Sequence, residues 1–214
     1  MARMLFIFAI LLLTGAYSPS ICGLPQEDKY RLNPTLDPGA KYKVYVPVDL
    51  EDAFKELNKM LHPDLIKEMK DGEESGIWQY HMGLGLWMRN NWVLWGGGRL
   101  AKYFNSLGIY HPDDMSGIIL TSFCRRLNGK PLRLEEQIAY YQEYWRLHAE
   151  PKNKRCAHDR STLIISQWMD DETADGKLRV IHIARCKGKK HLWVYEADRG
   201  WYKPDAGLRK KIGA

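Results

Sequence analysis

The spacing of apolar residues between positions 44 and 148 predicts a helical region. Asp49 can cap a helix in which Leu50, Phe54, Leu57 and Leu61 recur at intervals of four, three and four residues. This spacing places all four on one face of a helix. Apolar stripes and glycine or Asn-Gly stop signals predict about six helices in all. The other five are expected to begin near Pro63, Ile77, Arg99, Pro112 and Glu135.

The pattern changes after Glu150, where β-branched and aromatic residues form short runs. Residues 161–168, 178–186 and 191–196 are predicted strands, and residues 201–202 can add a short fourth. Asp175-Gly176 lies between the first two runs and is a typical hairpin signal. The chain is therefore predicted to be α+β: a compact all-helical domain at 44–148, then a small antiparallel β meander at 149–214.

The N-terminus has the organisation of a secretory signal peptide. Arg3 is followed by the uncharged apolar run LFIFAILLL at residues 5–13 and then by small residues. Cleavage after Ala16 fits the small-x-small rule, and cleavage after Ser20 is an alternative, as is an uncleaved anchor. We therefore predict a signal peptide at 1–20 and a secreted or periplasmic protein. With the signal removed, no apolar run reaches the ~20 residues of a membrane span.

Residues 21–43 carry three prolines among polar residues and are predicted to form a linker or arm. Cys22 lies just after the predicted signal peptide, where a lipoprotein carries its lipid-modified cysteine. Pro19 and Ile21 stand where a lipoprotein signal has small residues, which argues against a lipid anchor.

The other three cysteines are interpreted through the predicted export, since an oxidising compartment permits disulfides. Cys156 and Cys186 share the C-terminal segment and are the favoured disulfide pair. Cys124 lies in an apolar helical stretch and is predicted to be a buried thiol. The chain has no CxxC motif and no Cys/His spacing typical of zinc, so no metal and no cofactor are predicted.

Composition and charge exclude some classes and divide the chain. Apolar residues make up 45% and charged residues 27%, which excludes a wholly disordered chain. Residues 149–214 contain 15 basic and 9 acidic side chains, a net charge of +6. Residues 44–148 contain 12 basic and 14 acidic side chains, a net charge of −2, so the positive charge of the chain is concentrated in the C-terminal part. An anionic surface is a candidate partner for this basic tail, and export makes nucleic acid a poorer candidate. The tail's basic and aromatic residues include Lys187, Lys189, Lys190, His191, Trp193, Arg199, Trp201, Tyr202, Lys203, Arg209, Lys210 and Lys211.

The stretch from His81 to Tyr103 is the densest in aromatic, amide and cationic side chains. Tryptophan faces stack on sugars, bases or cations, and arginine and asparagine supply hydrogen-bond donors. The alternative is a tightly packed pair of helices in which the tryptophans are core. The candidate binding residues are Trp87, Arg89, Asn90, Asn91, Trp92, Trp95 and Arg99.

A second candidate site consists of His81, His111, Asp113 and Asp114. Two imidazoles and two carboxylates are sufficient for acid–base catalysis or for a divalent metal. The alternative is helix-start chemistry, because Pro112 and its acidic neighbours suit the first turn of a helix. His-Pro-Asp recurs at 62–64 in the same context.

The motif GLGLWMRNNW at 83–92, followed by LWGG at 94–97, RLA at 99–101 and HPDDMSG at 111–117, resembles an uncharacterised bacterial domain family. The resemblance covers residues 44–148. It implies a bacterial source, which agrees with periplasmic or secreted localisation, and it implies no activity. The arm and the basic tail lie outside it.

These observations favour an exported bacterial protein without enzymatic activity. Its helical domain would present the Trp/Arg/Asn cluster, or an adjoining groove, to an unknown protein or small ligand, and an immunity-like role is one instance. The absence of a complete catalytic motif motivates this hypothesis. The alternative is an envelope hydrolase that uses His81, His111, Asp113 and Asp114, with or without a metal.

Overall fold

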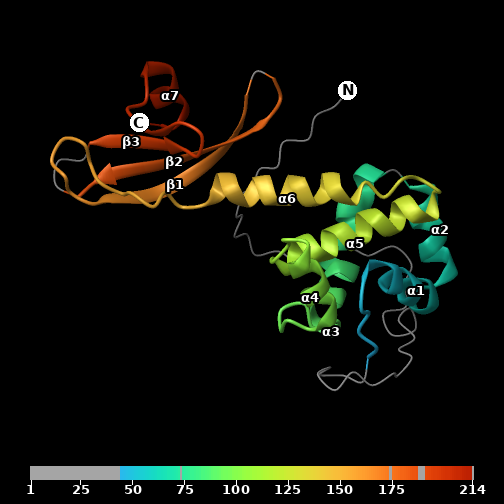
Figure 1. The fold of residues 1–214 in the computed structure, drawn as a ribbon. Helices are drawn as coiled ribbons and strands as arrows, with labels where there is room; N and C mark the ends of the chain where they lie inside the picture. The colour runs from blue at the N-terminus through green and yellow to red at the C-terminus, as the bar shows by residue number, and fades with distance from the viewer. Residues whose placement is uncertain (1–43, 73, 174, 188–190, 214) are drawn as a thin grey trace, which may run out of the picture.

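The computed structural model describes residues 44–72, 74–173, 175–187 and 191–213. The predicted signal peptide, the linker and Cys22 lie outside these residues. Within them the chain is α+β, as predicted, with helices followed by a four-stranded antiparallel sheet and one further short helix (Figure 1). No helix in these ranges combines the length and the hydrophobicity that a bilayer crossing requires.

Helix α5 is the centre of the helical part. It contacts the helices before it and α6 after it, and ten of its sixteen residues are buried. Both His-Pro-Asp motifs begin helices, with the histidine as N-cap and the proline at the first position. The elements are α1 (Leu50–Met60), α2 (Pro63–Asp71), η1 (Glu74–Tyr80), η2 (His81–Gly85), α3 (Leu86–Asn91), α4 (Arg99–Ser106), α5 (Pro112–Leu127) and α6 (Leu134–His148).

The helix predicted to begin near Ile77 is divided into three pieces. Segment η1 has 3-10 geometry, η2 is a π-helical turn and only α3 is α-helical. Gly85 lies where this segment approaches α5, and a Cβ there would stand 3.1 Å from Arg89 Nη1 and 3.5 Å from Leu120. The glycine therefore permits the close approach. The π turn changes the direction in which His81 and Arg89 project, which a uniform helical period does not predict.

The β module is a meander in the order β1-β2-β3-β4, with every neighbouring pair antiparallel. A bulge between Ile165 and Gln167 shifts the register of β1 against β2. Helix α7 (Ala206–Lys211), which the sequence pattern did not predict, packs Leu208 on one face of the sheet. The strands are β1 (Leu163–Glu172), β2 (Leu178–Cys186), β3 (Leu192–Glu196) and β4 (Gly200–Tyr202).

Helix α6 joins the two parts, running from the helical bundle to the sheet (Figure 1). His182 on β2 contacts the Leu147 carbonyl oxygen through Nε2 at 3.1 Å, and His148 Nε2 lies 2.9 Å from Asp170 Oδ1. Arg146 donates to both carboxylate oxygens of Asp198 at 2.7 and 3.0 Å. The last residues of α6, Arg146 to His148, are thus fixed against the β module, and the preceding turns lie along α5, from Gln137 on Ser122 to Trp145 on Asp114.

Candidate binding groove and the ion-pair network beside it

Arg89 is a buried cation that ties α3 to the first turn of α5. Its side chain is 4% exposed, with Nε 2.8 Å from Asp113 Oδ1, and Nη1 donates to Ser116 Oγ at 2.8 Å. The Nε–H does not point at the carboxylate well enough to make a hydrogen bond, so the contact is an ion pair. A buried guanidinium is stable only with such partners. Arg89, predicted as a binding residue, is therefore buried, and these contacts join it to α5 within the protein.

Two of the neighbouring candidates, Asn91 on α3 and its C-cap Trp92, also make contacts within the fold. Trp92 is 1% exposed and packs edge-on against Trp87, with ring centroids 5.9 Å apart. Asn91 donates from Nδ2 to the Trp87 carbonyl at 2.9 Å, within its own helix. Asn90 is exposed. This arrangement is the packed-helix alternative that the sequence left open.

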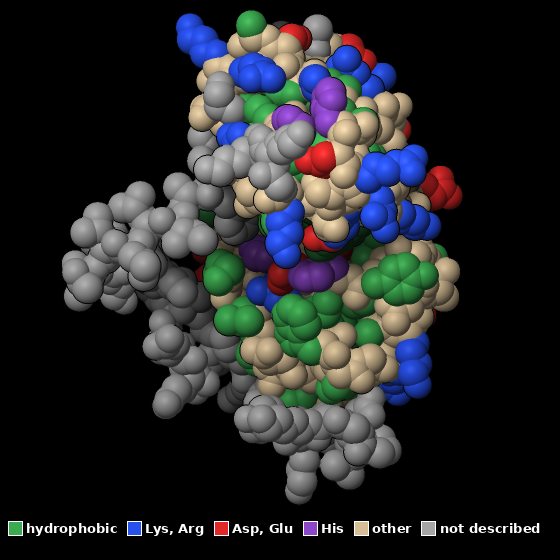
Figure 2. All heavy atoms as spheres, turned by 90° about the vertical axis from the view of Figure 1, so that its left-hand side faces the viewer, with side chains coloured by type: hydrophobic (Ala, Val, Ile, Leu, Met, Phe, Trp, Pro, Cys, Tyr) green, Lys and Arg blue, Asp and Glu red, His purple; other side chains and the backbone are tan. Residues whose placement is uncertain are grey.

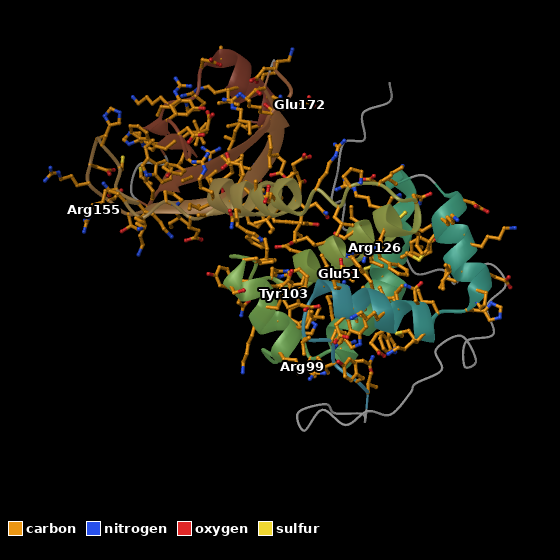
Figure 3. All side chains as sticks on the ribbon, turned by 45° about the vertical axis from the view of Figure 1, so that its right-hand side comes forward. Glu51, Arg99, Tyr103, Arg126, Arg155 and Glu172 are labelled. Carbon is orange, nitrogen blue, oxygen red and sulfur yellow. The ribbon has the colours of Figure 1, made fainter. Side chains whose placement is uncertain are left out.

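Trp95 and Arg99 lie apart from that core. Trp95 is 58% exposed, and its ring meets His111 edge-on at 5.8 Å. Arg99, labelled on α4 in Figure 3, donates to the Val46 carbonyl and lies over the Tyr45 ring at 4.7 Å. Arg99 thus contacts the segment before α1, whereas Trp95 contacts His111, a residue that lines the groove described below.

His81 and His111 converge on the two oxygens of Asp113. His81 Nε2 lies 3.7 Å from Asp113 Oδ1, and His111 Nδ1 lies 3.7 Å from Oδ2. His111 Nδ1 also accepts the Asp113 backbone N–H at 3.3 Å, as the N-cap of α5. Burial, and then the Arg89 charge, lower the pKa of His81, while Asp113 and Asp114 act in the opposite direction.

Acidification is expected to destabilise the protein through His81. Because the pKa of His81 is lower in the folded chain than its ordinary 6.5, folding favours the neutral ring. Its contribution is therefore complete above pH 6.5 and is lost as the pH falls through the folded-state pKa. The free energy of unfolding, measured by urea titration on either side of that window, should fall less on acidification in His81→Gln than in the wild type. Equal losses would contradict this assignment.

Asp114 is directed toward α6. It is 7% exposed, and Oδ2 accepts the indole N–H of Trp145 at 2.6 Å. Burial raises the pKa of Asp114, although the Trp145 hydrogen bond and the charge of His111 lower it. The four predicted catalytic residues are thus neighbours in space, with Asp113 on the Arg89 side and Asp114 on the Trp145 side.

A groove of about 430 Å³ opens on the Trp145 side. His111 contributes to its wall and also touches Trp145, with ring centroids 5.3 Å apart and a tilt of 33°. Trp95, His111 and Trp145 therefore form a row of three rings. Figure 2 shows histidine, acidic and hydrophobic side chains gathered in a hollow on one face. The lining residues are Gly108, Ile109, Tyr110, His111, Asp114, Gln142 and Trp145.

Sequence reasoning missed Tyr110, Gln142 and Trp145 as site residues. Trp145 shares a helical stripe with Ile138 and Tyr141, a pattern typical of core, but 46% of its surface is exposed. Tyr110 is 73% exposed, beside the turn at Gly108, whose φ is +79°. The sequence feature that could have indicated a site is a large aromatic residue close to a glycine turn. That feature does not indicate that Gln142 and Trp145 of α6 lie opposite the turn.

The basic tail uses several of its charges internally. Lys211 donates to Asp171 at 2.6 Å, and Arg209 to the Pro204 carbonyl at 3.2 Å. The Arg199 guanidinium lies 3.6 Å from the centroid of the Tyr202 ring. Lys189 and Lys190 lie outside the described residues, and binding of an anionic surface stays a prediction.

The three described cysteines are buried. Cys124 donates from Sγ to the Met69 carbonyl at 3.1 Å, and burial raises its thiol pKa, as expected of the predicted buried thiol. Cys156 and Cys186 are both free thiols in the structure, yet their sulfurs lie within 4.8 Å of each other. The disulfide between them stays a prediction.

The comparisons with known proteins bear on the helical part alone. No curated protein and no solved structure matches the chain. Residues 46–127, however, match the model of a known family. The groove lies across the end of this match, because its α4–α5 side falls inside the matched residues and its α6 side falls outside. The family is described as a domain of unknown function (DUF6794), and the match confirms the resemblance to an uncharacterised domain family.

Proposed function

We propose that the protein is an exported, non-enzymatic binding protein that takes a small ligand in the groove between the α4–α5 turn and α6. The observation that carries this proposal is the convergence of two exposed aromatic residues, the buried Asp114 carboxylate and the half-buried His111 ring on one hollow. Exposed tryptophan and tyrosine side chains lose contact with water when a ligand covers them. A groove of about 430 Å³ is within the range of small-molecule sites.

A saccharide ring is the ligand chemistry that fits this wall. A sugar has an apolar face of C–H groups and an edge of hydroxyls. Trp145 and Tyr110 offer exposed aromatic surface. Beside them lie the Asp114 carboxylate, whose Oδ2 accepts the Trp145 N–H, and the Gln142 amide, whose Nε2 donates to the Leu107 carbonyl; each group has further hydrogen-bonding capacity. The Asp113 charge is already paired with Arg89, so the groove does not present two free carboxylates to a cation.

Replacing Trp145 by alanine is expected to weaken saccharide binding about two- to tenfold through the lost aromatic contact, which contributes ~0.5–1.5 kcal/mol, and further through the lost apolar area. The measurement is isothermal titration of the full chain with mono- and oligosaccharides. The matched control is Trp168→Ala, because Trp168 is 63% exposed on β1 and does not line the groove. Absence of binding by the wild type, or equal losses in both variants, would contradict the proposal.

The convergence of His81 and His111 on Asp113 favours one second candidate, a hydrolase. A neutral histidine beside a carboxylate can act as a general base. Against it, Asp113 is held by Arg89, and Asp114 is bonded to Trp145. Turnover of an oligosaccharide by the wild type that His81→Gln abolishes, with binding retained, would favour the hydrolase over the binding protein.

A further inference from the structure

Four potential metal ligands meet at one end of the β module. One donor atom from each of Cys156, Asp159, Cys186 and His191 lies within 4.8 Å of all the others. Both cysteines are buried, and Asp159 and His191 are half-buried. Figure 3 labels Arg155, the residue before Cys156, at one end of the module, and Glu172 at the opposite end of β1.

The distances among these atoms suit tetrahedral coordination. Cys156 Sγ lies 3.6 Å from His191 Nδ1, Cys186 Sγ lies 3.6 Å from Asp159 Oδ2, and His191 Nδ1 lies 4.0 Å from that same oxygen. Zinc bond lengths of about 2.0–2.3 Å put the ligand atoms of a tetrahedron roughly 3.3–3.8 Å apart. Small side-chain movements would therefore bring the four atoms to a shared ion.

Hydrogen bonds around the cluster orient its ligands. Asp159 Oδ1 accepts the Ser161 backbone N–H at 3.0 Å and the Ser161 hydroxyl at 2.6 Å, while Oδ2 is the oxygen near Cys186. The backbone N–H of His191 points at Cys186 Sγ, 3.3 Å away. Such contacts fix a carboxylate and support a thiolate in metal sites.

The fold supplies these ligands from two places along the chain. A turn from Cys156 to Arg160, closed by the Arg160 N–H on the Cys156 carbonyl at 2.9 Å, carries Cys156 and Asp159. Cys186 ends β2 and His191 directly precedes β3, and the Cys186 N–H donates to the His191 carbonyl at 3.1 Å. An ion held by both pairs would join the irregular segment 149–162 to the sheet.

We propose that Cys156, Cys186, His191 and Asp159 form a structural zinc site. Two thiolates, one imidazole and one carboxylate in a closed, largely buried arrangement suit zinc better than magnesium or calcium, which prefer all-oxygen sites. The core beneath the site is small, with Leu163, Ala184 and Trp193 as its buried members beside the two cysteines. Small modules with such cores are commonly stabilised by a metal or a disulfide. A disulfide would use the two sulfurs alone and leaves the convergence of Asp159 and His191 unexplained.

The test is metal binding by the reduced full chain. Cobalt(II) alone is the first probe, because tetrahedral thiolate coordination gives it intense visible absorption bands and a thiolate charge-transfer band. We expect these bands at one cobalt per chain, their loss when zinc is added, and one zinc per chain in elemental analysis of the purified protein. Because these measurements use the wild type, they do not depend on the folding of a variant.

Substitutions then assign the ligands. Cys156→Ser and His191→Ala should abolish the cobalt bands. Cys124→Ser should keep them, because Cys124 lies in the helical core. His158→Ala should keep them too, because the exposed His158 ring packs 4.9 Å from His191 and lies outside the cluster. A chelator should lower the thermal midpoint of the wild type and leave that of Cys156→Ser unchanged.

Three results would overturn the zinc site. One is an octahedral cobalt spectrum without thiolate bands. Another is retention of the tetrahedral bands in Cys156→Ser. The third is peptide mapping that finds a Cys156–Cys186 disulfide in the isolated protein, which would replace the metal site with the disulfide as the bond that joins the two segments.

Discussion

Trp92→Ala should destabilise the protein by about 3–5 kcal/mol, while Trp95→Ala should change its stability by less than ~0.5 kcal/mol. The two tryptophans are three residues apart in sequence and opposite in environment: 1% of Trp92 is exposed, against 58% of Trp95. Removing the Trp92 ring leaves a cavity where it meets Trp87. Removing the Trp95 ring uncovers no core. Urea unfolding of both variants and the wild type measures the difference.

Comparing these two variants distinguishes a tryptophan of the core from one beside the candidate site. If Trp95→Ala proved as destabilising as Trp92→Ala, Trp95 would belong to the core and would not be available to a ligand beside His111. If neither substitution lowered the stability, the burial of Trp92 against Trp87 would be contradicted. The same Trp95→Ala variant, if stable, is suited to ligand titrations.

Asp113→Ala should cost about 3 kcal/mol of stability, the second large effect. The substitution leaves the Arg89 guanidinium, 4% exposed, without the carboxylate 2.8 Å from its Nε. Although the Asp113 side chain is itself 40% exposed, its removal is costly because the Arg89 charge stays desolvated. The free energy of unfolding at neutral pH, from urea titration, measures the loss.

A double-mutant cycle identifies the cause. Arg89→Met combined with Asp113→Ala should cost less than the sum of the two single changes, since the double variant has no buried unpaired charge. The control is Glu51→Ala, which breaks the exposed pair between Glu51 and Arg126, seen pointing toward each other in Figure 3. That change should cost no more than ~1 kcal/mol. Strict additivity of the Arg89 and Asp113 changes would contradict the ion pair as the origin of the loss.

Most of the fold follows from local chemistry. Asp49 caps α1 by accepting the Asp52 N–H at 2.8 Å, and Pro63 and Pro112 begin α2 and α5 as predicted. The hairpin at Asp175-Gly176 joins β1 to β2. Two elements differ from those that the hydrophobic pattern predicts, and in both the contacts with other elements account for the difference. Close approach to α5 divides the helix predicted near Ile77, and contact with the sheet holds the short α7, which has few residues to show a period.

The candidate sites were harder to predict because their residues come from distant positions. Asp114 and Trp145 are 31 residues apart and meet only through the packing of α6 on α5. Cys156 and Cys186 were predicted to form a disulfide, which stays a prediction, although their sulfurs lie within 4.8 Å of each other; their spacing to Asp159 and His191 matches no common zinc motif. The prediction that no metal binds therefore rested on sequence spacing, whereas the proposed zinc site rests on distances.

A ligand is expected to occupy the groove beside Trp145. The most direct measurement is an NMR titration of the full chain with saccharides, observing the indole N–H signals assigned by single tryptophan substitutions. We expect the signal of Trp145, whose N–H bonds to Asp114, and that of Trp95, which contacts His111, to shift on binding, and the signal of the buried Trp92 to stay in place. Shifts confined to Trp168, Trp193 or Trp201 of the β module, or no shift with any saccharide, would contradict it.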